Sequence, residues 1–74
     1  MSKEIKSHLT GTVWKIEVAI GESVEEDEDY MILESMKMEM PISAESDCVI
    51  KDILVTEGEA VASEQNLIKL QMIN

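Results

Sequence analysis

The chain contains no arginine, and its six lysines stand against sixteen aspartates and glutamates. The formal charge of −10 repels the phosphate backbone of nucleic acids and the headgroups of anionic lipids. Cysteine is nearly absent as well. Cys48 is the single cysteine, so an internal disulfide is excluded. We therefore expect neither a nucleic-acid nor a membrane partner, and we interpret Cys48 as a small buried apolar residue.

Long apolar runs are also missing. No hydrophobic stretch follows residues 1–4, so the sequence predicts neither a signal peptide nor a spanning helix. Together with the lone cysteine, this indicates a protein of the reducing cytoplasm. The 74 residues make one small domain, 1–74, and a domain of this size buries only about 60% of its unfolded surface. So thin a core leaves little room for a catalytic cavity, and an enzyme is not expected.

The two halves of the sequence repeat each other at an offset of 37 residues. The shift needs no gap, and among other identical pairs it places Gly21 on Gly58 and Leu33 on Leu70. A long period in so short a chain indicates two copies of one supersecondary unit, neither of which can bury its hydrophobic face alone. We therefore expect one domain with approximate two-fold symmetry.

The symmetry also predicts where the chain ends lie. The shift maps Lys37 onto Asn74, so the counterpart of the segment around Lys37 is the place where the two ends of the chain meet. We expect the termini to lie side by side, at the pole opposite Lys37.

Secondary structure is predicted to be strand throughout. Segments rich in β-branched residues alternate with turns, two of them at glycines, and predict strands over residues 3–7, 12–18, 30–34, 38–43, 49–55 and 66–71. Residues 23–30 include five consecutive acids, whose mutual repulsion disfavours a helix, so this segment is predicted as a loop. Short strands between turn signals indicate an all-β sandwich or flattened barrel.

Met36 and Lys37 stand between two of these strands and are predicted to form the two-residue tip of a hairpin. The register that follows places apolar pairs on the inward side and a glutamate pair on the outward side. The expected pairs are Ser35 with Met38, Glu34 with Glu39, Leu33 with Met40 and Met31 with Ile42. Because such tips favour Asn-Gly, a Met-Lys tip suggests a site retained for something other than folding.

The segment Glu34-Ser35-Met36-Lys37-Met38-Glu39-Met40 resembles the biotin attachment motif, Glu-Ala-Met-Lys-Met, of biotin carboxyl carrier domains. The segments 11–13, 21–24 and 58–61 also resemble glycine-containing motifs of that family, so the resemblance covers nearly the whole chain. It implies a flattened β-barrel of two four-stranded antiparallel sheets, with Lys37 on an exposed hairpin. The resemblance is greatest to a stand-alone biotin/lipoyl attachment protein.

The resemblance further implies that a biotin protein ligase acylates Lys37. Met36 and Met38 then serve as recognition residues for the ligase, and Glu34, Ser35 and Glu39 flank the tip. The attached biotin would carry a carboxyl group between partner carboxylase and carboxyltransferase sites, and the carrier, a monomer, would catalyse neither step. A lipoyl carrier is the alternative: Ser35 replaces the usual alanine, although lipoyl domains typically carry Asp-Lys-Ala at the tip.

The methionines offer a second alternative. Met36, Met38 and Met40 alternate along the chain, and soft thioether ligands are suited to Cu(I). Against copper binding, Met40 is expected to point inward as core filler, and no export signal precedes it. Pro41 is expected on an edge strand, where its missing N–H does no harm.

Overall fold

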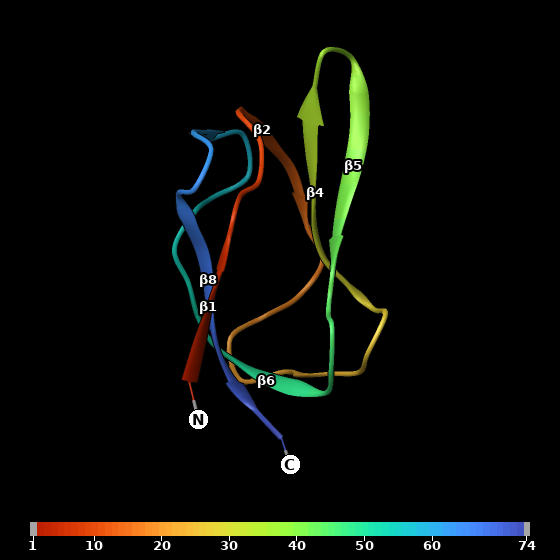
Figure 1. Cartoon of the computed structure of the whole chain (residues 1–74), viewed down its shortest axis with the longest axis vertical. Helices are drawn as coiled ribbons and strands as arrows, with labels where there is room; N and C mark the ends of the chain where they lie inside the picture. The colour runs from red at the N-terminus through yellow and green to blue at the C-terminus, as the bar shows by residue number, and fades with distance from the viewer. Residues whose placement is uncertain (1, 74) are drawn as a thin grey trace.

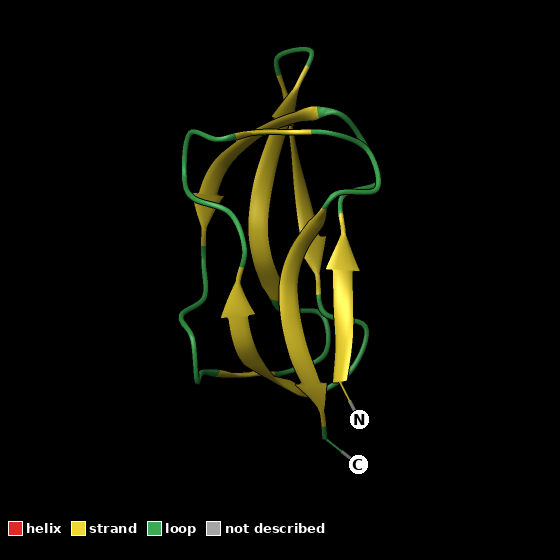
Figure 2. Cartoon of the chain, turned by 90° about the vertical axis from the view of Figure 1, so that its left-hand side faces the viewer, coloured by secondary structure: helices red, strands yellow, loops and turns green. Residues whose placement is uncertain are grey.

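Eight strands form the computed structural model, which describes residues 2–73 (Figure 1). They are β1 (Ser2–Lys6), β2 (Gly11–Ile16), β3 (Ser23–Val24), β4 (Asp29–Ser35), β5 (Met38–Ser43), β6 (Cys48–Ile53), β7 (Ala60–Val61) and β8 (Asn66–Met72). One antiparallel sheet has the order β1-β8-β6-β3 and the other β5-β4-β2-β7. Within the described residues no helix occurs (Figure 2). The predicted all-β fold of two four-stranded antiparallel sheets is confirmed.

The repeat in the sequence is also a repeat in the structure. A shift of 37 residues places β2 on β6, β3 on β7 and β4 on β8, and it places β5 on β1. The irregularities repeat as well: the register shift between Val13 and Lys15 matches the one between Ile50 and Asp52. The sheet orders are equivalent under the same shift. The predicted two-fold symmetry is therefore confirmed down to the bulges.

The described ends of the chain, in β1 and just after β8, lie at the pole opposite the β4–β5 hairpin (Figures 1 and 2). The molecule is elongated, with extents of 36 × 18 × 18 Å, and the turn between β4 and β5 projects at one end of the long axis. At the other end Ser2 pairs with Gln71. The described ends of the chain therefore lie where the symmetry predicts, and Met1 and Asn74 themselves lie outside the described residues.

Two details of the strand prediction were wrong. β2 and β6 end at Ile16 and Ile53, two residues earlier than expected, and the short strands β3 and β7 were missed. The predicted loop over residues 23–30 is only partly a loop, because Val24 in β3 and Tyr30 in β4 are each 2% exposed. Burial of these two side chains anchors both ends of the acidic segment. Within it, the backbone N–H of Glu25 donates to the Glu28 carboxylate at 2.8 Å.

The core lies between the two sheets and consists of inward-facing apolar side chains from both halves. Its members are Val13, Val24, Tyr30, Met31, Leu33, Ile42, Ala44, Cys48, Ile50, Val55, Val61, Leu67, Ile68 and Leu70. Cys48 is fully buried and unpaired with another cysteine, as expected. Among residues 2–73 there is no helix long and apolar enough to cross a membrane.

One polar contact crosses this core, and it predicts a pH dependence. The Tyr30 hydroxyl and the Cys48 thiol are hydrogen-bonded at 3.3 Å. Burial, followed by the hydrogen bond with Cys48, raises the pKa of Tyr30. An unfolded tyrosine titrates at about pH 10. The stability that the neutral, buried Tyr30 contributes to the fold is therefore fully present below that pH and is lost progressively as the pH rises above it.

We therefore expect the free energy of unfolding of Tyr30→Phe to fall less steeply above about pH 10 than that of the parent protein. Urea unfolding at a series of alkaline pH values measures both curves. Because the chain has one tyrosine, ultraviolet absorbance of the phenolate reports its ionisation directly. Parallel curves for the two proteins would contradict the prediction.

Candidate functional site at the hairpin tip

The turn between β4 and β5 consists of Met36 and Lys37, and both have a positive φ, 52° and 64°. A two-residue hairpin turn of type I′ requires positive φ at both positions, since this matches the twist of the strands it joins. For a residue with a Cβ, the left-handed conformation costs roughly 1–2 kcal/mol. The tip thus has the predicted hairpin geometry without the residues that would adopt it at least cost.

The predicted register of the hairpin is confirmed. Ser35 pairs with Met38, Glu34 with Glu39, Leu33 with Met40 and Met31 with Ile42. Leu33 and Met31 are fully buried and Ile42 is nearly so, whereas Met40 on the edge strand β5 is only half-buried. The strand continues past the end of the core, so Met38, two residues nearer the tip on the same side, is 59% exposed.

Lys37 itself is exposed, and its neighbour Met36 is 92% exposed. Each of the other five lysines lies within a strand: Lys3, Lys6, Lys15, Lys51 and Lys69. The ion pair found within residues 2–73 joins Lys15 to Glu17 at 3.7 Å, which leaves the Lys37 amine to solvent. Lys37 is therefore the lysine that lies on a turn rather than within a strand, and its side chain is exposed.

The start of β2 fixes the base of the hairpin. The Ser35 hydroxyl donates to the Thr10 carbonyl at 3.0 Å, and Thr12 pairs with Glu34. Gly11 packs so closely that a Cβ there would lie 2.5 Å from the Glu34 carbonyl oxygen. Only a glycine permits this approach, and it holds β4 against β2 to within two residues of the turn. Sequence reasoning missed this support: the glycine of the segment 11–13 was noted, but the backbone it contacts was not.

Two glutamates stand directly below the tip on the outward side. Glu34 and Glu39 are opposite one another in the β4–β5 ladder, and both are exposed. Like charges in directly opposed positions destabilise a sheet. The structure thus brings all six sequence-selected residues into one hairpin, with Met36, Lys37 and Met38 at the tip and Glu34, Ser35 and Glu39 below.

The strain at the turn predicts that a protein with more favourable turn residues would be more stable but would lack the Lys37 site. Replacing Met36 by asparagine and Lys37 by glycine should raise the free energy of unfolding by about 1–2 kcal/mol, because these residues adopt positive φ at little cost. Urea unfolding measures the gain. A matched control, Met38→Asn within β5, should lower stability instead, since asparagine is disfavoured in strands. Equal stability of the tip variant and the parent would show that the turn is unstrained.

Comparisons with known proteins agree with this geometry. A family model described as biotin-requiring enzyme matches residues 1–70. The biotin/lipoyl attachment protein of Bacillus subtilis is 35% identical over 66 residues, which cover 89% of this chain and 90% of that protein. Pyruvate carboxylase of Staphylococcus aureus is 36% identical over 67 residues, which cover 90% of this chain but only 6% of that enzyme.

A solved structure is similar over almost its full length. The lipoyl domain of the 2-oxoglutarate dehydrogenase complex of Azotobacter vinelandii superposes with a TM-score of 0.82 at 35% identity. The match covers 92% of this chain and 94% of that domain. The chain thus spans nearly all of one small attachment protein and of one lipoyl domain, and a small part of a large carboxylase.

Proposed function

Because the chain belongs to the biotin/lipoyl family of biotin-requiring enzymes, whose model matches residues 1–70, we propose that Lys37 carries covalently attached biotin. The protein is then a swinging-arm carrier that moves a carboxyl group between a carboxylase and a carboxyltransferase site. The observation that supports this proposal is the position of Lys37, on an exposed two-residue turn at one end of a long and narrow molecule.

Attachment requires a separate ligase. The ligase activates biotin as biotinyl-AMP, the neutral Lys37 amine attacks the carbonyl carbon of the mixed anhydride, an amide bond forms and AMP leaves with the bonding electrons. The amine proton must pass to a base. Because the tip is open to solvent, the ligase supplies that base. The carrier contributes position: a rigid barrel presents the arm at one pole and raises its effective concentration at a partner's active sites.

The residues at the tip favour biotin over lipoate. Met36 and Met38 enclose Lys37 in a Met-Lys-Met sequence, whereas lipoyl domains of this family typically have Asp-Lys-Ala. The likeness to a lipoyl domain and to a protein named for both groups makes lipoate the second candidate. The comparisons favour either carrier over the Cu(I)-binding alternative.

The proposal also extends to partners and compartment. A biotin protein ligase and the components of a biotin-dependent carboxylase are the expected partners, in line with the likeness to one domain of pyruvate carboxylase. A buried free thiol at Cys48 suits the reducing cytoplasm. We propose that the carrier acts as a monomer, because the projecting tip must enter the active sites of other proteins.

Intact mass spectrometry of the protein purified from its own host tests the proposal. Biotin and lipoate add different masses, and peptide mapping locates the added group. The expected result is one biotin on Lys37. A chain that carries no modification in its host, and that neither ligase labels in vitro, would refute the carrier function.

Ligase choice should depend on the two methionines at the tip. Changing Met36 to aspartate together with Met38 to alanine is expected to shift acceptance from biotin ligase toward lipoyl ligase, by about tenfold or more in relative rate, as expected when recognition contacts are changed. Rates with both purified ligases measure the shift. Met72→Ala, far from the tip, is the control and should leave the ratio unchanged. An unchanged ratio in the tip variant would place selectivity elsewhere on the barrel.

A further inference from the structure

The two-fold symmetry provides an internal control for every exposed side chain. Residues separated by 37 positions occupy equivalent places in the two sheets, so a residue that the fold requires should have a similar partner. On the outer face of the sheet β1-β8-β6, Glu4 pairs with Lys69, which pairs with Asp52. Lys51 lies in the adjacent bulge. All four residues are charged.

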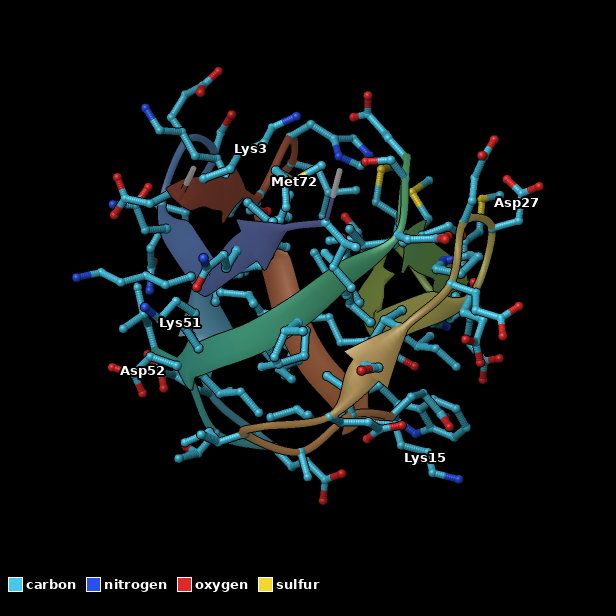
Figure 3. All side chains as sticks on the ribbon, turned by 90° about the horizontal axis from the view of Figure 1, so that it is seen from below. Lys3, Lys15, Asp27, Lys51, Asp52 and Met72 are labelled. Carbon is cyan, nitrogen blue, oxygen red and sulfur yellow. The ribbon has the colours of Figure 1, made fainter. Side chains whose placement is uncertain are left out.

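These four residues, with Lys3, line an open hollow of about 530 Å³. Figure 3, seen from below, shows Lys3, Lys51 and Asp52 on one flank of the molecule and Lys15 on a different flank. Charged and solvated side chains are therefore fully compatible with the backbone at these positions.

The equivalent positions on the sheet β5-β4-β2 are mostly apolar. Pro41 pairs with Ile32, which pairs with Lys15, and Trp14 lies in the bulge beside Lys15. Trp14 is 49% exposed, Pro41 is exposed and Ile32 is half-buried. We call Trp14, Ile32 and Pro41 the apolar patch. Since the other sheet carries Lys51, Lys69 and Glu4 in the same places, the fold does not explain why this patch is apolar.

The apolar patch is continuous with the tip. Ile32 and Pro41 lie on the two strands of the hairpin, and the Glu34–Glu39 pair lies between them and the turn. Ile32 is five residues from Lys37, which corresponds to roughly 16 Å of extended strand. A protein–protein interface of ordinary size buries about 800 Å² per partner. The patch, the glutamate pair and the tip therefore fall beneath a single partner surface.

We propose that the apolar patch is the docking surface for the ligase that modifies Lys37. The inference rests on the function proposed above and identifies a second contact area for the same partner. The complementary ligase surface has an apolar pocket for Trp14 and basic side chains that face Glu34 and Glu39. Partly exposed tryptophans of this kind are frequent binding hot spots. A cation between the two carboxylates would also relieve their mutual repulsion, which the free protein leaves uncompensated.

The experiment measures the initial rate of biotinylation by purified biotin ligase against carrier concentration. Trp14→Lys and Ile32→Lys each introduce the residue type found at the symmetry-equivalent position, so the backbone tolerates them. The uncharged variants Trp14→Ser and Ile32→Ser separate loss of apolar contact from added charge. All four are expected to lower kcat/KM more than tenfold through KM, with kcat unchanged. The matched controls Lys51→Ser and Lys69→Ser on the other sheet should leave both constants unchanged.

The outcomes test the docking surface separately from the carrier function. Normal kcat/KM in the four patch variants, with the parent protein labelled, would overturn the docking surface and leave the carrier function intact. A loss in kcat, or one that follows a loss of native structure in thermal unfolding, would also overturn it. Sedimentation that shows a parent dimer broken by Trp14→Lys, with labelling unchanged, would assign the patch to a second copy of the chain. Failure of the parent protein to be labelled by either ligase would instead refute the carrier function.

Discussion

Lys37→Ala is expected to abolish ligase-dependent labelling completely while leaving the fold unchanged. The side chain is exposed and outside the core, so its removal should change the free energy of unfolding by no more than about 0.5 kcal/mol. Alanine, like lysine, has a Cβ, so the left-handed φ of 64° at this position has a similar cost in the variant. The measurement is incorporation of biotin by intact mass, beside thermal unfolding of the same sample.

Two further variants complete the test. Lys37→Arg preserves the positive charge but removes the amine, so it should also be unlabelled. Lys69→Ala removes a lysine that lies within a strand of the other sheet, and it should be labelled at the parent rate. Biotin found on Lys15 or on another strand lysine of the Lys37→Ala protein would contradict the assignment.

The second large effect concerns stability and tests the symmetry energetically. Leu33 and Leu70 are fully buried and equivalent under the repeat. Leu33 lies in β4, between β5 and β2, and Leu70 lies in β8, between β1 and β6. Leucine-to-alanine changes in a core cost about 2–5 kcal/mol. A whole domain is typically stable by only about 5–15 kcal/mol. Either change is therefore expected to remove a large part of the stability of so small a domain.

We expect the two costs to agree within about 1 kcal/mol, because the two leucines occupy equivalent packing environments. Equilibrium urea unfolding measures both. Leu54→Ala is the control: Leu54 is 38% exposed and its truncation should cost clearly less than either core change. A Leu70→Ala protein far less stable than Leu33→Ala would show that the halves match in backbone but not in energy.

The hairpin could be predicted because its determinants are local. In a strand, side chains alternate between faces, so one apolar pattern allows one register and a slip of one residue would expose the whole inward set. Met36 and Lys37 lie between two predicted strands, and the register set by a two-residue turn there gives Leu33 and Met31 the burial that they require. The four predicted residue pairs, and with them the position of Lys37, follow from a segment shorter than fifteen residues.

The missed strands had no such pattern. β3 and β7 contain two residues each, too few to show any alternation. Two things favour them. Val24 and Val61 bury their side chains, so that each is 2% exposed, and the backbone of β3 pairs with β6 while that of β7 pairs with β2. The acidic segment 25–29 misled the prediction in the same region, since its charges concealed the two buried residues, Val24 and Tyr30, on either side.

The early ends of β2 and β6 have a different cause. Each of these strands contains a register shift, after Val13 in one and after Ile50 in the other. A bulge adds a residue to one strand only, increases the local twist and turns the chain away from its partner. The sequence shows no glycine or proline at either bulge, so nothing local signals it. The bulges also determine that Trp14 and Lys51 lie outside the regular pairing.

By itself, the sequence of this protein determined the repeat, the principal strands, the register of one hairpin and a lysine at its tip, because each of these depends on residues close together in the chain or on a simple offset. Only the tertiary structure decided what surrounds that tip. The close approach of Gly11 to the Glu34 carbonyl, and the row that brings Lys15 beside Ile32 and Pro41, join segments far apart in sequence. Their proximity results from how strands pair and pack across the whole domain, which no local pattern specifies.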